Sequence, residues 1–316
     1  MLKTMILSMT SKPLKLADWC RRDALTGDAS PRRYSRLWAA DDRTAILVEY
    51  PQGVRSRLAD DLEVLSWCGR LGLNVPEVLG CDLPTGRAVL SDLGIDDGET
   101  ALEAAARDER PRLIEEMLQP LEVLAGCAVD ELPPWNPPLD RVRLRWELAG
   151  FELWFVRHYR SVSPSAALDR WLDELANEIG SHPRRVCHRD YHLNNLLIRE
   201  NGSVGVIDIQ DILIGPDTYD AVSLVSERAA TRLLPPAQRH EILASWAHRT
   251  RAEPGWRERS AAVQIQRGLK VLGTFARFTL AGRTEYRQWM SELARNLIEP
   301  LELRGAGCDT LDLLRA

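Results

Sequence analysis

The sequence predicts an α+β protein with a small β-rich N-terminal lobe and a larger α-helical C-terminal lobe. Short β-rich runs separated by turn signals occupy the first part of the chain, up to about residue 92. From Glu99 onward, apolar residues recur mostly at helical spacing. The chain of 316 residues is also long enough for two cores. We therefore predict lobes at residues 1–92 and 93–316.

Composition and charge exclude several classes of protein. The chain is 45% hydrophobic and 28% charged, which is ordinary for a globular protein, and its net charge of −5 does not fit a nucleic-acid surface. No apolar stretch approaches the length of a signal peptide or a membrane helix. The six cysteines lack C-x-x-C spacing and indicate reduced thiols. We expect a soluble cytoplasmic protein with no nucleic-acid or membrane partner.

The elements of the N-terminal lobe follow from local patterns. Residues 16–25 are expected to form a short amphipathic helix, and residues 27–37 a small-residue turn that enters a strand. A turn at Asp41-Asp42 and a second strand over 44–50 come next, followed by a helix over 60–71. Two further strands, near 75–79 and 88–94, are joined by a turn at Pro84-Thr85-Gly86. The last of these strands would lead into the second lobe.

The elements of the C-terminal lobe are mostly helices. Apolar spacing predicts them over the ranges 101–107, 113–129, 164–179, 236–246, 257–278 and 285–297, and residues 139–159 form an unusually aromatic stretch. One β-hairpin interrupts them: the apolar runs 195–198 and 204–209 flank Asn201-Gly202, the strongest two-residue hairpin signal.

This hairpin brings three polar side chains to the ends of its strands. Asp190 precedes the first strand in H-R-D, Asn195 begins that strand, and Asp208 ends the second strand. This spacing is typical of a kinase catalytic loop and its metal-binding carboxylate. Asp190 would accept the proton of an acceptor hydroxyl, while Asn195 and Asp208 would hold the Mg²⁺ that accompanies ATP. Turn chemistry explains a single Asp or Asn in a loop, but not the whole constellation.

The N-terminal lobe would then bind the nucleotide. Small residues in the 27–37 loop allow main-chain N–H groups to approach phosphates, with Ser30, Arg32 and Arg33 as candidates and Arg36 as added positive charge. Backbone groups near Ser91 and Leu93 would bind the adenine edge. An exposed hairpin tip with surface arginines is the alternative for the loop, since it has no G-x-G-x-x-G.

The lysine of protein kinases is absent from the second strand, which has Val48-Glu49 at the expected position. We expect Arg32 or Arg33 to contact the phosphates instead. Glu63 is the candidate for the helix carboxylate that pairs with such a cation, although an exposed helical glutamate is more often only solvated.

The acceptor site is expected in the aromatic stretch, where aromatic rings lie beside carboxylates. Glu147 and Trp154, together with Asp211 from the hairpin, are candidates for substrate binding, with core packing as the alternative for the aromatics. A cationic acceptor would favour an acidic pocket built from Glu147, Glu152 and Asp211. An N-acetyl sugar would favour aromatic stacking and amide partners.

The chain resembles the aminoglycoside phosphotransferase and choline kinase superfamily. The motifs that carry the resemblance are H-R-D-Y-H-L-N-N-L-L, V-I-D-I-Q-D, G-P-D-T-Y-D-A-V-S-L, G-D-A-S-P-R-R-Y-S-R-L and Q-R-G-L-K-V-L-G-T-F-A-R, spread over about Asp23 to Arg277. Within it, the chain is similar to bacterial anomeric kinases of N-acetylmuramate and N-acetylglucosamine. It departs from their pattern at Pro31 and Ser35, where an aromatic is usual, and at Val48-Glu49, where Met-Asp is usual.

This resemblance implies a bilobal protein-kinase-like fold that uses ATP with Mg²⁺. It also implies phosphorylation of the C1 hydroxyl of an amino sugar in cell-wall recycling, with Asp190 as base and Asn195 and Asp208 as metal ligands. Two alternatives stay open: a phosphotransferase for an aminoglycoside or amino alcohol, and a nucleotide-binding regulatory module without catalysis. Only the absent strand lysine favours the module.

Overall fold

The computed structural model describes residues 14–25, 31–199, 201–305 and 308–315. The chain divides into two compact units: unit 1 is Met1–Ala104 with Leu193–Ile212, and unit 2 is Ala105–His192 with Leu213–Ala316. The division differs from the predicted boundary after residue 92. The β-hairpin belongs to unit 1, although residues on both sides of it belong to unit 2, because its strands pack and hydrogen-bond with segments of unit 1.

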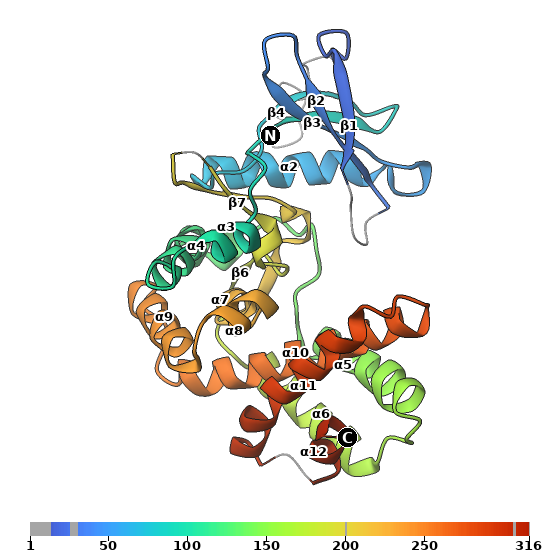
Figure 1. Ribbon diagram of the computed structural model, residues 1–316, viewed down its shortest axis with the longest axis vertical. Coiled ribbons are helices and arrows are strands. Elements are labelled where there is room, and N and C mark those ends of the chain that lie inside the picture. The colour runs from blue at the N-terminus through green and yellow to red at the C-terminus, as the bar shows by residue number, and fades with distance from the viewer. Residues whose placement is uncertain (1–13, 26–30, 200, 306–307, 316) are drawn as a thin grey trace. The chain divides into compact units, whose positions relative to one another are not determined.

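Unit 1 contains an antiparallel five-stranded sheet in the order β1-β2-β3-β5-β4 (Figure 1). Its strands are β1 (Arg21–Leu25), β2 (Arg33–Trp38), β3 (Thr44–Glu49), β4 (Val78–Asp82) and β5 (Arg87–Ser91). The predicted strands over 27–37, 44–50 and 88–94 and the turn at Asp41-Asp42 are confirmed, whereas the strand expected near 75–79 lies at Val78–Asp82. The predicted helix over 16–25 is wrong: residues 16–20 are not helical, and Arg21–Leu25 pairs with β2 as an edge strand.

Each face of this sheet has its own small core, as strand alternation requires. Helix α2 (Arg57–Arg70) covers one face, where Leu58 and Leu62 pack with Val48 and Leu90. On the other face, Leu47 packs in a cluster that Leu16 and Trp19 join.

The hairpin consists of β7 (Leu196–Ile198) and β8 (Val204–Val206), paired as predicted around the turn at Gly202, whose φ is 78°. The hairpin is attached to the segment that follows β5: Ile198 N–H donates to Asp96 O over 2.9 Å, and Leu93 packs on Gly205. A Cβ on Gly205 would lie 2.9 Å from a terminal methyl of Leu93, so a larger residue here would require the Leu93 side chain to shift.

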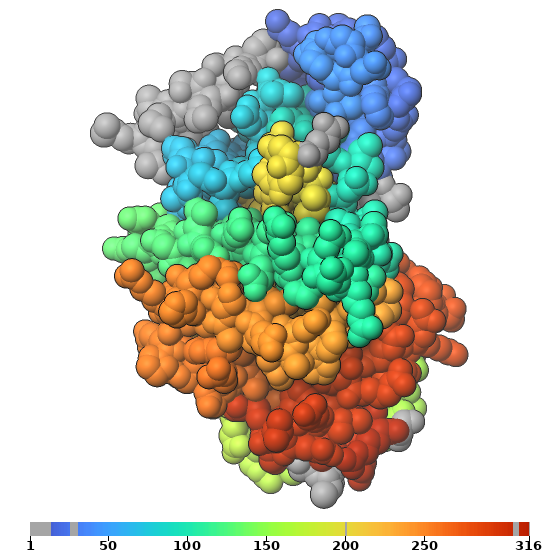
Figure 2. Space-filling model, turned by 60° about the vertical axis from the view of Figure 1, so that its left-hand side comes forward, coloured from blue at the N-terminus to red at the C-terminus, as the bar shows by residue number. Residues whose placement is uncertain are grey.

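Unit 2 is mainly helical (Figure 1). Its helices are α4 (Arg110–Ala125), α5 (Arg141–Gly150), the π-helix η3 (Phe151–Tyr159), α6 (Ala166–Gly180), α7 (Tyr219–Val225), α8 (Arg228–Leu233), α9 (Pro236–Arg249), α10 (Trp256–Leu280), α11 (Tyr286–Leu303) and α12 (Cys308–Arg315). The short helix α3 (Gly98–Ala104) belongs to unit 1. Figure 2 shows one face of unit 2, on which the green segment containing α4 borders the orange segment of α9.

The core of unit 2 is one apolar cluster shared by α5, η3, α6, α10 and α11, including Phe151, Leu172, Leu272 and Leu297. A two-stranded sheet of β6 (Arg184–Cys187) and β9 (Leu213–Pro216) lies in the same unit. Within the described ranges, no helix has the length and hydropathy needed to cross a membrane.

A close helix crossing fixes α10 against the junction of α5 and η3. A Cβ on Gly273 would lie 2.8 Å from the main chain of Gly150 and of Phe151. The two backbones approach this closely only because residue 273 has no side chain. The crossing sets the distance between the polar residues of α5 and those of α10.

Candidate active site

Unit 1 holds both predicted metal ligands. Asn195 ends the short turn before β7, and its main-chain O accepts the N–H of Ile207 over 3.0 Å, which ties it to the residue before Asp208. Asp208 has φ 61°, a left-handed conformation that costs a non-glycine residue about 1–2 kcal/mol. Its carboxylate is 39% exposed and accepts a hydrogen bond from the Gln210 amide over 2.7 Å.

Arg32, the residue before β2, contacts carboxylates from two other segments of unit 1. Arg32 lies 3.3 Å from the Asp61 carboxylate on α2 and 3.6 Å from the Asp208 carboxylate. Tyr50 donates to the same Asp61 oxygen over 2.7 Å. Arg32 therefore connects a helix carboxylate with a predicted metal ligand, as the hypothesis of a substitute phosphate-binding cation requires.

The other candidates near this strand lie elsewhere. Arg33, the first residue of β2, is exposed, whereas its neighbour Arg32 is half-buried. Arg36 is bound to the segment after β5, donating to Asp92 over 2.6 Å and to Gly94 O over 2.8 Å. Arg36 is thus held within unit 1 by Asp92 and Gly94, and its added charge at the phosphate site stays a prediction. The helix carboxylate that pairs with Arg32 is Asp61 rather than Glu63.

Ser91 and Leu93 differ in whether their main-chain groups already form hydrogen bonds. The main-chain N–H of Ser91 donates to Glu77 O over 2.8 Å, and its hydroxyl accepts the N–H of Glu77 over 2.8 Å. Leu93 is buried, but in the described part of the chain its main chain makes no hydrogen bond. Ser30 lies outside the described residues.

Unit 2 holds Asp190, on a loop that several bonds fix in one conformation. Asp220, in the first turn of α7, accepts the N–H of His188 over 2.6 Å and that of Arg189 over 2.9 Å. Arg267 donates to Arg189 O over 3.2 Å, and its guanidinium stacks on the Tyr219 ring at 4.6 Å. These contacts hold Arg189 at φ 80°, immediately before the predicted base.

The electrostatic surroundings of Asp190 keep it ionised. Burial raises the pKa of this carboxyl, but the positive charges of Lys270, Arg189 and Arg267 outweigh burial and the net pKa is lowered. A carboxylate with a lowered pKa is fully deprotonated at neutral pH and can accept a proton.

Behind the loop lies a buried charge cluster that contains Glu147. Its side chain is 2% exposed, with Lys270 Nζ at 3.3 Å and Arg189 at 3.6 Å, and Gln266 donates to its other oxygen over 2.9 Å. Burial raises the pKa of Glu147, but Lys270, the Gln266 hydrogen bond and Arg189 lower it by more. Glu147 is therefore an ionised carboxylate that this chain's own cations already neutralise.

The other two acceptor candidates, Trp154 and Asp211, have contacts of their own. Trp154, on η3, packs against the core of unit 2 and contacts the His158 ring at 5.5 Å. Asp211 belongs to unit 1, where its charge acts on Asp61. The three predicted substrate residues thus belong to two different units.

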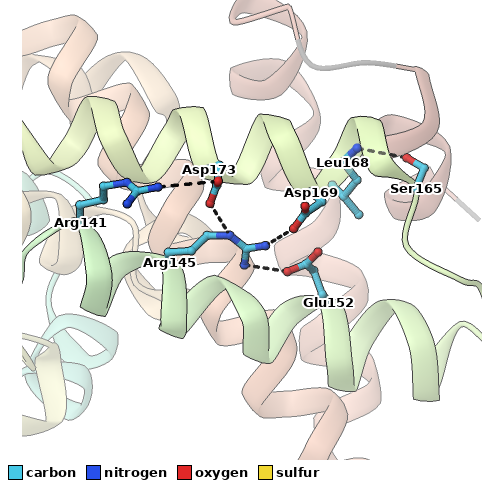
Figure 3. Close-up of polar contacts among 7 residues, drawn as sticks. All are labelled: Arg141, Arg145, Glu152, Ser165, Leu168, Asp169 and Asp173. Atoms are coloured by element: carbon cyan, nitrogen blue, oxygen red, sulfur yellow. Dashed lines mark hydrogen bonds and ion pairs between the residues drawn. The ribbon is translucent and has the colours of Figure 1, made fainter.

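Glu152 belongs to a separate ion-pair network in unit 2 (Figure 3). Arg145 of α5 reaches Glu152 on η3 over 2.7 Å, Asp173 on α6 over 2.9 Å, and Asp169 on α6 as well. A single guanidinium thus joins three helices, and Glu152 is not available to bind a cationic acceptor.

Two of these residues escaped sequence reasoning. Asp61 lies two positions before Glu63 and was missed because the facing side of a helix cannot be fixed to one residue from periodicity alone. Lys270 lies within the Q-R-G-L-K-V-L-G block but was given no role. One available signal was that Lys270 is the only lysine after Lys15.

A sheet-and-helix unit that carries the hairpin and a helical unit that carries a constrained H-R-D loop are typical of kinase-like phosphotransferases. A family model described as "Phosphotransferase enzyme family" matches residues 23–261. The chain belongs to this family, and the predicted resemblance is confirmed. It is an ATP-dependent phosphotransferase whose acceptor group is a hydroxyl, so the non-catalytic alternative is set aside.

Curated relatives are similar over most of the chain. A Pseudomonas aeruginosa protein named N-acetylmuramate/N-acetylglucosamine kinase is 31% identical over 80% of this chain and 75% of its own length. A Neisseria meningitidis serogroup B protein of the same name is 28% identical over 82% of this chain and 79% of its own length.

A solved structure shows the same fold. The structure of a choline/ethanolamine kinase family protein from Mesorhizobium loti superposes with a TM-score of 0.63 and 16% identity, covering 99% of both chains. The predicted α+β, protein-kinase-like fold class is confirmed.

Proposed function

We propose that this enzyme uses ATP and Mg²⁺ to phosphorylate the anomeric hydroxyl of an amino sugar, N-acetylmuramate or N-acetylglucosamine, in cytoplasmic cell-wall recycling. The names of the relatives support the choice of acceptor. The alternative acceptors, an aminoglycoside or amino alcohol, carry positive charge.

The observation that carries this proposal is that two of the three carboxylates expected to bind a cationic acceptor, Glu147 and Glu152, are already paired. Glu147 is neutralised by Lys270 and Arg189, and Glu152 by Arg145. The positive charges of Lys270, Arg189 and Arg267 act on Asp190. A polycationic acceptor would meet like charges at this loop, which is unfavourable, whereas a neutral or acidic sugar would not.

Asp190 is proposed as the general base. The acceptor hydroxyl oxygen forms a bond to the γ-phosphorus of ATP, the bond from that phosphorus to the β–γ bridging oxygen breaks, and ADP leaves with the bond's electron pair. Asp190 takes the hydroxyl proton as the oxygen attacks. The hydrogen bonds from His188 and Arg189 to Asp220 keep the loop in place, so that the base needs no rearrangement.

Asn195 and Asp208 are proposed to hold Mg²⁺. Their side chains offer amide and carboxylate oxygens, the hard donors that this ion prefers, and the Asp208 carboxylate is the more exposed of the two. When bound, Mg²⁺ supplies charge neutralisation on the phosphates. Arg32 is proposed to contact the same phosphates once they separate it from Asp208, and the Leu93 main chain to bind the adenine edge.

A coupled ADP-release assay tests this proposal. The panel comprises N-acetylmuramate, N-acetylglucosamine, glucose, choline and an aminoglycoside, with ATP and Mg²⁺, and the Asp190→Ala variant as control. We expect turnover of the N-acetyl sugars alone. Turnover of only the cationic acceptors would contradict the proposal and favour the alternative acceptor class.

A further inference from the structure

Lys270 is chemically unusual in this chain. Every basic residue after Lys15 other than Lys270 and the histidines is an arginine. An arginine presents a planar fork that suits fixed bidentate pairs, whereas a lysine presents a compact ammonium with three rotatable donors. The single exception lies beside the predicted base, where burial and the neighbouring charges act on both residues.

The position of Lys270 is set by the packing of α10. The Gly273 crossing brings α10 onto the end of α5, and Lys270 Nζ then lies 3.3 Å from Glu147. Gln266, one turn earlier on α10, donates to the other oxygen of the same carboxylate over 2.9 Å. The Q-R-G-L-K-V-L-G block thus places an ammonium at the catalytic loop and holds it there.

Lys270, Arg189 and Arg267, whose positive charges act on Asp190, differ in the contacts that they make. Arg267 donates to the main chain of the loop and stacks on Tyr219. The main-chain N–H of Arg189 donates to Asp220, and the Arg189 guanidinium lies 3.6 Å from the Glu147 carboxylate. Within the described part of the chain, the Lys270 ammonium has one polar partner, Glu147, and it has three N–H groups.

The side chains of Lys270 and Arg189 are more exposed to solvent than the neighbouring carboxylates. The Lys270 side chain is 23% exposed and that of Arg189 is 17% exposed, whereas that of Glu147 is 2% exposed. Asp220 is also buried and accepts two main-chain N–H groups. Apart from Asp190, an acceptor would therefore meet positive rather than negative side chains here.

We propose that Lys270 binds an acidic substituent of the acceptor, so that the enzyme favours a sugar bearing a carboxylate over the neutral sugar with the same ring. The inference rests on the proposed function and adds a specificity-determining residue to it. Burial lowers the pKa of Lys270, but Tyr219, Glu147 and Asp190 raise it by more, so the ammonium stays charged.

The two acceptors named for the relatives make a matched pair for this test. N-acetylmuramate is N-acetylglucosamine with a carboxylate-bearing ether on the ring, so the ratio of their kcat/KM values isolates the carboxylate. In Lys270→Met we expect kcat/KM for N-acetylmuramate to fall about 10- to 100-fold, mainly through KM, as expected for losing a charged hydrogen bond. The value for N-acetylglucosamine also falls where Glu147 loses its partner, but by less, so that the ratio of the two values shifts toward the neutral sugar.

Three further variants make the result specific. Lys270→Arg keeps the charge and should restore part of the preference for the acidic sugar. Lys270→Met combined with Glu147→Gln removes both members of the pair and remains testable if the single variant fails to fold. Arg277→Met, two turns further along α10 and exposed, should leave the ratio unchanged.

The outcomes separate this inference from the proposed function. Equal losses for both sugars in Lys270→Met would show a structural role and overturn the inference, leaving the proposed function intact. The same holds if the wild-type enzyme uses N-acetylglucosamine but not N-acetylmuramate. Turnover of neither sugar by the wild-type enzyme would overturn the proposed function, and the inference with it.

Discussion

Each unit contains a cation–carboxylate pair beside a predicted catalytic residue: Arg32–Asp61 in unit 1 and Lys270–Glu147 in unit 2. The two pairs differ in whether the surrounding groups offset the effect of burial on the pKa of the carboxylate. In unit 1, burial raises the pKa of Asp61, and Tyr50, Arg32 and Arg57 do not fully offset it. In unit 2, Lys270, Gln266 and Arg189 outweigh burial, so the pKa of Glu147 is lowered.

The difference shows that the sign and distance of neighbouring charges, and not the number of partners, decide the state of a buried carboxylate. Asp61 has Tyr50, Arg32 and, at 4.0 Å, Arg57 around it, but the negative charge of Asp211 opposes them. Glu147 has two cations and an amide around it. The first pair is suited to releasing its arginine to a phosphate, and the second is suited to holding a loop.

The largest expected effect comes from removing the predicted catalytic residue in each unit. Asp190→Ala should lower kcat by about 10²- to 10⁴-fold, the usual contribution of a general base, while leaving ATP affinity nearly unchanged. Asp208→Ala should also abolish most turnover, but with weaker binding of Mg²⁺·ATP. Steady-state kinetics and nucleotide titration by calorimetry measure the two quantities.

Both variants should keep the wild-type circular dichroism spectrum. Near-normal kcat in both would contradict the kinase assignment of these residues. Equal losses of nucleotide affinity in both would contradict the division of roles between the units.

The helix crossing that supports the Glu147–Lys270 pair can be broken by one methyl group. Gly273→Ala places a Cβ 2.8 Å from the main chain of Gly150, which should cost about 1–3 kcal/mol of unfolding free energy. Gly150→Ala is the matched control, because its Cβ would meet nothing within 4 Å. Urea unfolding should show a loss for the first variant and no loss for the second; similar midpoints would refute the tight crossing.

A buried histidine of unit 2 should make stability depend on pH. Burial lowers the pKa of His182 to about 4, and within the described residues neither ring nitrogen has a hydrogen-bond partner. The unfolded chain takes up a proton below its ordinary pKa of about 6.5, while the folded chain does not until about pH 4. Stability should therefore fall as the pH drops from 6.5 to 4.

Between pH 7.5 and pH 5 this linkage predicts a loss of about 2 kcal/mol of unfolding free energy from His182. In His182→Gln the same pH change should cost correspondingly less. Urea midpoints at the two pH values measure the difference, and parallel losses in both proteins would show that other groups cause the pH dependence.

The smallest expected effect tests the looser pair of unit 1. Arg32→Met should raise KM for ATP by about tenfold or more, with a smaller change in kcat, because a charged hydrogen bond to phosphate is lost. Arg33→Met is the natural comparison, since the Arg33 side chain is exposed, whereas that of Arg32 contacts Asp61 and Asp208. An unchanged KM in Arg32→Met, or equal increases in both, would contradict the role of Arg32.

Most of the fold could be predicted because strong local signals agreed with the tertiary structure. Asn201-Gly202 gave the β7–β8 hairpin, and helical periodicity gave α2, α6, α9, α10 and α11. Residues Arg21–Leu25 could not be assigned, since their strand state depends on pairing with β2 and every side chain is exposed. Pairing between distant segments likewise assigns the hairpin to unit 1.

For the site, residue spacing alone predicted Asp190, Asn195 and Asp208. The residues that surround them could be identified only from the structure. Asp61 and Lys270 act across distances of 29 and 123 residues, to Arg32 and Glu147 respectively, and no local pattern encodes such pairs. Glu147 and Glu152 could be predicted as candidates for an acidic pocket, but their neutralisation by Lys270 and Arg145 depends on helix packing.

The central claim is that the acceptor atom is the anomeric hydroxyl of an N-acetyl amino sugar. NMR of the products formed from N-acetylglucosamine and N-acetylmuramate labelled with ¹³C at C1 tests it most directly, in the presence of ATP and Mg²⁺. We expect the C1 signal of at least one sugar to shift and split by coupling to phosphorus, with no such change in Asp190→Ala. A phosphorylated product with an unsplit C1 signal, or no phosphorylated sugar at all, would contradict the claim.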